Sequence, residues 1–240
     1  MAEEGDRSGD PEVPVGRDLR HQLPEEVAAY VRELILSGKV KHGEFLRLEP
    51  IAEALGVSNT PVREGLLSLR AEGLVNLVPR RGFVVGSFTR QDVEDIFWAQ
   101  AMIGSELAAR AAARITKQDL RRLQEIQELH RKAVEEGDVA DIAKLGRDFH
   151  RVINLAAGSP RLATLMGGVV AYLPNRFYAL IDAQVQSTLH AHPAIVESLQ
   201  RGNARSARAQ MRDHIRAGGD SLIADLDARG IWNDLGEAAS

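Results

Sequence analysis

In the first third of the chain, apolar residues recur every three or four positions in three short stretches, the spacing of one helix face. The first stretch, LPEEVAAYVRELILSG, starts at Pro24, a residue favoured in the first turn of a helix, and stops at Gly38. After an extended FLRL segment, EPIAEALG ends at Gly56, and the third stretch runs from Pro61 to Gly73. The pattern predicts three helices joined by short loops.

A strand pattern follows these helices directly. LVNLV and FVVGSF are rich in β-branched residues and flank the tight turn PRRG at 79–82, which predicts a two-stranded ribbon. Three helices followed by a ribbon form a winged helix-turn-helix, so we expect residues 17–86 to be a DNA-binding domain. The preceding residues 1–16 are acidic and rich in Pro and Gly, which predicts a disordered tail.

Beyond a linker at 87–91 the strand pattern disappears, and the chain is a succession of amphipathic helical segments. We expect helices near 91–114, 117–136, 139–157, 160–184, 187–201 and 203–228, with a kink at Pro174 in the fourth. The expected fold class is therefore mainly α: a winged helix-turn-helix with three helices and a two-stranded wing, then an all-α six-helix bundle. The bundle would span 92–230 and leave 231–240 as a C-terminal tail.

Composition narrows the class of protein. With 44% hydrophobic and 27% charged residues among 240, the chain is globular. The absence of cysteine excludes disulfides, thiolate zinc sites and cysteine nucleophiles, and it suits a reducing cytoplasm. No apolar run approaches the roughly 18 residues of a membrane span, so we expect no membrane association. The net charge of −4 arises mostly in the tail, which leaves 17–86 close to neutral, so DNA binding would need clustered arginines.

The start of the third helix has the residues that a DNA-reading helix needs. Ser58, Asn59 and Thr60 are short polar side chains that suit contacts with phosphates and base edges. Arg63, one turn further on, is a long planar donor able to reach both acceptors of a guanine.

The wing turn adds two guanidinium groups at the tip of the ribbon. Arg80 and Arg81, followed by Gly82, would lie where a phosphate backbone or a minor groove passes. Arg47, just before the second helix, is a further candidate for a phosphate contact.

The segment LGVSNTPVREGLLSLRAEGLVNLVPRRGFVV resembles the GntR family of bacterial transcription regulators, and the resemblance extends over residues 23–86. It implies binding of double-stranded DNA by a homodimer at a palindromic operator. Many members have Arg where this chain has Asn59. Because Asn favours adenine contacts, we expect an operator that differs from the family's usual GT…AC inverted repeat.

The second domain resembles the FCD ligand domain of GntR proteins, in its six-helix, VanR-like variety. The matching motifs are FHRVINLAAGSPRL at 149–162 and HPAIVESLQRGNARSARAQMRDHI at 192–215. The resemblance implies that three histidines and an aspartate hold a divalent metal ion with open positions for a carboxylate effector. The histidines match at His150, His192 and His214.

The residues themselves support a metal site at this trio. Each of the three lies on or beside an apolar helical stripe, and three neutral imidazoles bind zinc well, with nickel or manganese as alternatives. The family's aspartate, however, is Gly146 here. An arginine and a glutamate in the first helix of the family's domain correspond to Gln100 and Gly104.

Two interpretations of the second domain therefore remain open. The trio either binds a metal ion with water in place of the aspartate, or it belongs to a converted cavity that takes a larger, less acidic ligand. Candidate effector contacts in both cases are Gln100, Asn154, Tyr172 and Arg176. Any one of these residues, or any single histidine, is equally explained by packing or by surface exposure.

The function expected from the whole chain is a metabolite-responsive regulator of transcription, a repressor, that acts in the cytoplasm as a homodimer. The alternative is a DNA-binding dimer whose second domain is degenerate and senses nothing. A hydrolytic enzyme is disfavoured because the chain has no HExxH motif, no GxSxG motif and no phosphate-binding glycine loop.

Overall fold

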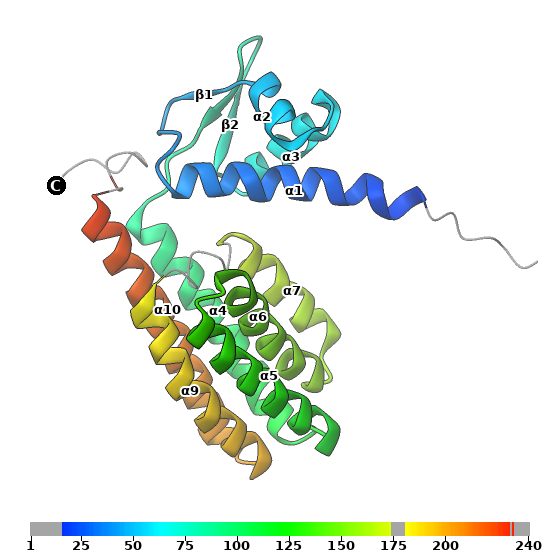
Figure 1. The fold of residues 1–240 in the computed structure, drawn as a ribbon, viewed down its shortest axis with the longest axis vertical. Helices are drawn as coiled ribbons and strands as arrows, with labels where there is room; N and C mark the ends of the chain where they lie inside the picture. Colours follow the sequence, from blue (N-terminus) through cyan, green and yellow to red (C-terminus); the bar gives the residue numbers. More distant parts are fainter. Residues whose placement is uncertain (1–15, 174–180, 231, 233–240) are drawn as a thin grey trace, which may run out of the picture.

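The computed structural model describes residues 16–173, 181–230 and 232, which form an N-terminal domain and a helical bundle below it in Figure 1. The fold is mainly α, with a small sheet confined to the N-terminal domain, so the predicted fold class is confirmed. Within the described residues, no helix is long and apolar enough to cross a membrane.

The N-terminal domain packs three helices against one antiparallel sheet. Its elements are α1 (Gly16–Leu36), β1 (Phe45–Leu46), α2 (Leu48–Leu55), α3 (Asn59–Ala71), β2 (Val75–Val78) and β3 (Gly82–Val85). The predicted ribbon is the pair β2–β3, and the extended FLRL segment adds β1 on the other side of β3, so the strand order is β1-β3-β2.

The first helix begins earlier than the sequence pattern predicted. It starts at Gly16, and Pro24 lies inside it. Before Pro24 the apolar pattern consists of Leu19 and Leu23 alone, and Pro24 was therefore predicted to be the start of the helix. Gly16, which was predicted to be the last residue of the N-terminal tail, is the first residue of α1.

Close contact between α1 and α3 fixes the core of this domain. A Cβ atom at Gly65 would lie 2.7 Å from the Pro24 carbonyl oxygen, so the two helices approach as closely as glycine permits. Val27 and Val31 of α1 and Leu66 of α3 are fully buried at this crossing. The position of α3, and with it of its N-terminal residues, therefore depends on this contact.

An ion pair stabilises the same helix pair at its other end. Arg32 is 7% exposed and donates to the Glu72 carboxylate from Nε at 3.2 Å and from Nη2 at 2.6 Å. Because removal of one partner leaves a largely buried charge unpaired, we expect Glu72→Gln to lower the free energy of unfolding by about 2–4 kcal/mol. Urea unfolding measures this change. Glu64→Gln, on the exposed face of α3, is the matched control, and an equal loss in both variants would contradict the expectation.

The C-terminal bundle consists of α4 (Arg90–Ala112), α5 (Lys117–Glu136), α6 (Val139–Ala156), α7 (Pro160–Ala171), α9 (Asp182–Gln200) and α10 (Ala204–Arg229). Capping boxes at Thr89 and Thr116 start α4 and α5. The long α4 and α10 pack side by side at the centre, where a Cβ atom at Gly219 would lie 2.7 Å from Cγ of Phe97. Small residues in α10 therefore let its backbone approach α4.

The predicted fourth helix, 160–184, is wrong at its C-terminal end. α7 ends at Ala171, and α9 begins at Asp182. Pro174, where a kink was expected, lies outside the described residues. Apolar periodicity continues through this stretch, and it does not reveal that the helix ends there.

Contacts between the two domains involve the end of α1 and the last turns of α10. Leu36, at the end of α1, faces Leu222 and Leu226 of α10 across a small apolar space. Within the bundle, Arg90, the first residue of α4, pairs with Asp227 of α10 at 2.5 Å. α10, which carries interior residues of the bundle, thus also reaches the DNA-binding domain.

Candidate nucleic-acid interface and metal-binding cavity

The start of α3 presents the short polar residues predicted to read DNA. Ser58 is the N-cap residue, Asn59 and Thr60 form the first turn, and all three are exposed. The Ser58 side chain makes no capping hydrogen bond, so its hydroxyl is available to a ligand. Arg63 is exposed one turn further along the same helix.

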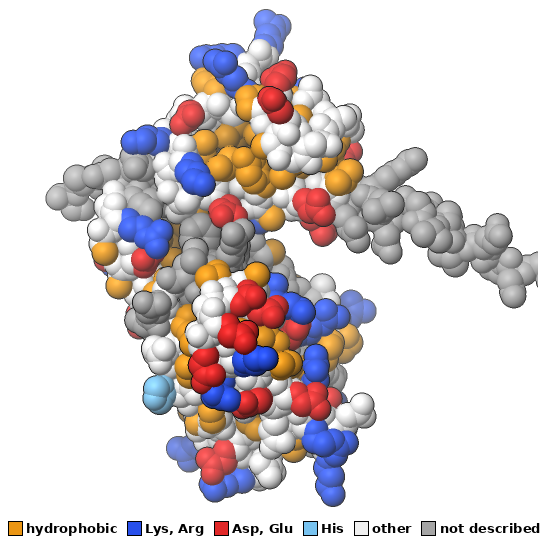
Figure 2. Space-filling model, viewed as in Figure 1, with side chains coloured by type: hydrophobic (Ala, Val, Ile, Leu, Met, Phe, Trp, Pro, Cys, Tyr) orange, Lys and Arg blue, Asp and Glu red, His pale blue; other side chains and the backbone are white. Residues whose placement is uncertain are grey.

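The arginines from three separate segments meet in one surface groove. Arg47 at the start of α2, Arg63 of α3, and Arg80 and Arg81 of the wing line it, together with Gly82. Figure 2 shows Lys and Arg side chains gathered at the end of the N-terminal domain farthest from the bundle. The structure thus brings together the arginines that the sequence analysis selected from positions far apart in the chain.

The wing turn holds its arginines in fixed directions. Arg81 N donates to Val78 O at 3.0 Å, and Arg80 adopts a φ of 64°. A positive φ costs a residue with a Cβ atom on the order of 1 kcal/mol, so the turn is strained at Arg80. The Arg81 guanidinium stacks on the Phe45 ring at 4.6 Å, which positions the second arginine against β1.

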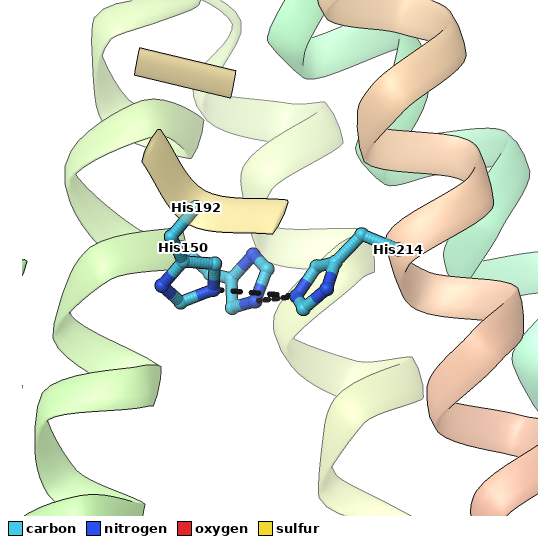
Figure 3. Close-up of side chains that lie close together, drawn as sticks. All are labelled: His150, His192 and His214. Carbon is cyan, nitrogen blue, oxygen red and sulfur yellow. Dashed lines mark hydrogen bonds between the residues drawn. The ribbon is translucent and has the colours of Figure 1, made fainter. Parts of the chain in front are cut away.

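The second site is the histidine trio, which lies inside the bundle (Figure 3). His150 comes from α6, His192 from α9 and His214 from α10. The His214 Nε2 atom lies 3.3 Å from Nε2 of His192 and 3.3 Å from Nε2 of His150. Each residue offers one ligand atom within 4.8 Å of the others. The three helices therefore aim the same ring atom of each histidine at a common point.

Two of the three separations equal those of neighbouring ligands around a tetrahedral ion, and the third pair of ligand atoms lies within 4.8 Å. With metal–nitrogen bonds of 2.0–2.1 Å, two ligands of a tetrahedral ion lie about 3.3–3.4 Å apart, whereas neighbouring octahedral ligands lie about 2.8–3.0 Å apart. Without a metal ion, one Nε2 of His214 has either one hydrogen or one lone pair, so it cannot bond well to both neighbours. Nδ1 of His214 is also buried with no partner among the described residues. A cation that accepts three lone pairs resolves the conflict at Nε2.

Burial keeps the three rings neutral. It lowers the pKa of His150 to about 4 and, together with the nearby His150, the pKa of His214 to about 3. The pKa of His192 lies well below its usual value, first because of burial and then because of its neighbouring histidines. Neutral imidazole is the form that binds a metal ion, so at neutral pH no proton has to be displaced.

Aromatic packing orients the most buried of the three. The His192 ring stacks on Phe149 with a centroid distance of 3.6 Å and an interplanar angle of 5°. Phe149 is fully buried and directly precedes His150. One turn of α6 therefore supplies the candidate ligand His150 and the aromatic ring that supports the candidate ligand His192.

A cavity of about 610 Å³ opens in front of the trio. Gln100 of α4 and Asn154 of α6 line it, as the sequence analysis expected. Tyr172 is half-buried at the end of α7 and is not among the residues that line the cavity, so its effector contact stays a prediction without support from the cavity wall. Arg176, the fourth candidate, lies outside the described residues.

Two glycines of the cavity region differ in the space beside them. A Cβ atom at Gly104 would lie 2.6 Å from Cδ1 of Ile215, so that space is filled by the protein. A Cβ atom at Gly146 would meet nothing within 4 Å, and Gly146 lines the cavity one turn before His150. Among the described residues no carboxylate joins the three nitrogens, and Asp148 only borders the cavity.

The sequence analysis missed one histidine of this cavity. His130 of α5 is 4% exposed, lines the cavity, and has its ring centroid 6.1 Å from that of His192. A signal was present, because His130 continues the buried stripe formed by Leu123, Ile126 and Ala133. Gln184 and Thr188 of α9, both buried, were missed as well.

Comparison with known families explains the two sites together. The model of the bacterial regulatory proteins of the gntR family matches residues 23–85, and the FCD domain model matches residues 95–217. The chain belongs to the GntR family. As a GntR protein with an FCD domain it is a DNA-binding regulator of transcription and not an enzyme.

Relatives of this GntR protein agree with that assignment. The HTH-type transcriptional regulator McbR of Escherichia coli K12 is 29% identical over 180 residues, 75% of this chain and 76% of McbR. The HTH-type transcriptional repressor RspR of the same organism is 22% identical over 200 residues, 82% of this chain and 88% of RspR.

Solved structures show the same fold. The structure of E. coli McbR/YncC matches with a TM-score of 0.69 at 24% identity, covering 85% of this chain and 98% of that one. A putative GntR regulator from Rhodococcus sp. RHA1 matches with a TM-score of 0.59 at 22% identity, with the same coverage.

Proposed function

We propose that this protein is a metabolite-responsive repressor that binds a palindromic operator as a homodimer and senses an effector in the histidine-lined cavity. Residues 17–86 would bind the DNA, residues 92–230 would bind the effector, and 87–91 would connect them. The main support for the proposal is that the Nε2 atoms of three histidines lie close together in the wall of an open cavity. The Nε2 atom of His214 is 3.3 Å from that of His192 and 3.3 Å from that of His150. The name of RspR as a repressor supports the direction of regulation. Because the proposed partner is chromosomal DNA, we place this action in the cytoplasm.

The metal ion proposed at the trio is zinc, with nickel or manganese as alternatives. His150, His192 and His214 would hold it through Nε2, and the ion would act as a Lewis acid that binds an effector's donor atom. The residues Gln100 and Asn154 would contact the remainder of the effector.

Coupling between the two sites has a physical route along α10. This helix carries His214 at the cavity, and further on it carries Leu222, Leu226 and Asp227, which face α1 and α4. An effector that binds one arrangement of α10 more tightly shifts the equilibrium by its differential binding free energy. Movement of α10 would thereby change the placement of the DNA-binding domain.

The proposed function is tested in two steps: selection of the DNA sequences that the protein binds, and a search for metabolites that release the protein from them. Oligonucleotides selected from a random pool by the purified protein should contain an inverted repeat, and metabolite mixtures should lower the affinity for it. Release that is lost with His214→Ala would link sensing to the trio. The alternative, a DNA-binding dimer with a non-sensing second domain, predicts an inverted repeat whose binding no metabolite or metal ion changes.

Dimer formation is proposed to use the outer face of α4 and α7. Trp98 and Met102 lie one turn apart on α4 and are 59% and 37% exposed, and Leu165 of the adjoining α7 is 61% exposed. Contiguous patches of exposed apolar side chains mark protein interfaces, and two of these three residues adjoin on one helix. We expect Trp98→Glu to convert dimer to monomer in sedimentation and to weaken operator binding at least about tenfold. Leu129→Glu, exposed on α5, is the control. A dimer that survives Trp98→Glu would exclude this face.

The wing arginines are proposed to contact phosphates. Arg80→Ala combined with Arg81→Ala should reduce the slope of log affinity against log salt by about 1–2, because each phosphate contact contributes about 0.9. Arg80→Gly adds a control for folding, since glycine accepts the φ of 64° and so removes the guanidinium without straining the turn. The salt slope is measured by fluorescence anisotropy between low and moderate salt. An unchanged slope in the double variant would remove the wing from the interface.

A further inference from the structure

The N-terminal segment of residues 1–15 carries the net negative charge of the chain. The chain has 30 basic and 34 acidic residues, and the segment contains one arginine and five carboxylates, which leaves 29 of each in the rest. Counting side chains, the segment has a charge of −4 and the rest of the chain is neutral. Segments with such an excess of one charge often act as interaction tails. The five carboxylates are those of Glu3, Glu4, Asp6, Asp10 and Glu12.

The groove that carries the proposed DNA contacts is basic and is not neutralised from within. Arg47, Arg63, Arg80 and Arg81, which line this arginine groove, are all exposed. Within the part of the chain that the structure describes, none of the four forms an ion pair, and Glu49 is the one carboxylate in the wall. An anionic occupant is therefore favoured in the groove when DNA is absent.

Residues 1–15 are long enough to reach this groove. Arg63 lies on α3 two residues before Gly65, where a Cβ atom would lie 2.7 Å from the Pro24 carbonyl oxygen. Gly16 begins α1 eight residues before Pro24, so a helix rise of about 1.5 Å per residue places Gly16 within roughly 25 Å of the Arg63 backbone. An extended segment of this length spans about 50 Å, which is twice that distance. The carboxylates can therefore lie over the groove while α1 stays in place.

The spacing of the carboxylates lets two of them face the groove together. Glu4 and Asp6 are two positions apart, and so are Asp10 and Glu12. In an extended chain, side chains two positions apart point to the same side, about 6–7 Å from each other. A guanidinium binds a carboxylate with the same paired donors that it offers to a phosphate. Either pair of carboxylates therefore offers the arginines the kind of ligand that a DNA backbone offers.

We propose that residues 1–15 bind the arginine groove of the same chain when DNA is absent, and that DNA has to displace them. The segment is an internal competitor, so the full chain binds any duplex more weakly than the exposed groove would. This inference rests on the proposed DNA contacts of the four arginines, and it adds a second ligand for them.

The first test removes the charges of the segment and keeps its length. The variant carries Glu3→Gln, Glu4→Gln, Asp6→Asn, Asp10→Asn and Glu12→Gln. It should bind a mixed-sequence DNA duplex about three- to tenfold more tightly than the wild-type protein at low salt, because two or three exposed ion pairs, each a factor of about 1.5–5, no longer compete. The gain should shrink as salt rises, since ions screen exposed pairs. Fluorescence anisotropy measures both effects, and an unchanged affinity would overturn the proposal.

A matched control separates occupancy of the groove from net charge. Four exposed carboxylates of α5, in the other domain, are changed to glutamine, which alters the net charge by nearly the same amount: Glu125, Glu128, Glu135 and Glu136. This variant should bind the duplex as the wild-type protein does. Equal gains in the two variants would show that net charge alone sets the affinity, and the proposal would fail.

The second test locates the segment directly. The chain contains no cysteine, so Ser8→Cys provides a single attachment site for a photoreactive benzophenone between Asp6 and Asp10. Without DNA, cross-links should fall on the two stretches that line the groove, 45–49 and 77–83, and addition of the duplex should remove them. Cross-links that lie elsewhere on the protein, or that DNA leaves unchanged, would contradict binding in the groove.

The third test separates this inference from the proposed function. In a chain that also carries Arg80→Ala and Arg81→Ala, neutralisation of the segment should raise DNA affinity much less, because the segment has lost two of its partners. If the two arginine changes alone leave the affinity for DNA unchanged, the proposed DNA contacts of the wing fail, and the inference fails with them. If the arginine changes weaken DNA binding and neutralisation gives no gain in either background, the inference alone fails.

Discussion

Replacement of His214 by alanine is expected to lower the zinc content of the protein from about one ion per chain to background. His214 is the central member of the trio, because its Nε2 atom makes both of the 3.3 Å contacts. Two remaining imidazoles from α6 and α9 would leave the ion with too few protein ligands to hold it through purification. The measurement is elemental analysis of protein purified without chelators and without a nickel column.

The same substitution should remove the stabilisation that zinc gives. A ligand present at 1,000 times its dissociation constant stabilises the folded state by about 4 kcal/mol. We therefore expect zinc to raise the melting temperature of the wild-type protein and to leave that of His214→Ala unchanged. His190→Ala is the matched control, since His190 is exposed on the same helix as His192 and bonds only to the Gln186 carbonyl. Equal zinc contents in wild type and His214→Ala would rule out the trio as the binding site.

Much of this architecture follows from apolar periodicity, and the exceptions have specific physical reasons. Buried stripes with clear caps predicted α5 to the residue, because Thr116 and Gly137 bracket it. The beginning of α1 was missed because Pro24, a residue favoured in the first turn of a helix, was predicted to be its start, whereas Pro24 lies inside the helix. The end of α7 was missed for a different reason: Val169 and Val170 keep an apolar pattern up to the break.

The histidine trio was also predicted only in part from the sequence. Its three members were predicted by resemblance and by their positions on apolar stripes, and the structure adds that the same nitrogen of each converges on one point. Sequence alone could not distinguish the two glycines that replace the family's acidic residues. The space at Gly104 is closed by Ile215, which is more than one hundred positions away in the chain, whereas no atom lies within 4 Å of a Cβ atom placed at Gly146. Likewise, the position of His130 beside His192 depends on which helix α5 faces in the assembled bundle.

Arg63 is expected to be the residue on which base specificity depends most. It is exposed one turn into α3 and shares a groove with Arg47, Arg80 and Arg81, for which we propose phosphate contacts. A guanidinium that reaches base edges contributes about 1–3 kcal/mol of discrimination per good bidentate contact. Arg63→Ala should therefore weaken operator binding by about 5- to 150-fold and relax the preference at one base pair in each half-site.

The control variant for this prediction is Arg70→Ala, which removes an exposed arginine from the last turn of the same helix. Affinities are measured for the selected operator and for each single base-pair variant of one half-site, at one fixed salt concentration, because affinity for DNA depends steeply on salt. If Arg63 contacts a base, Arg63→Ala should weaken binding to the operator. It should hardly weaken binding to the operator sequence that is changed at the contacted base pair. If the loss were equal for every sequence, Arg63 would be a phosphate contact, and base recognition would fall to Asn59 and Thr60 at the start of α3.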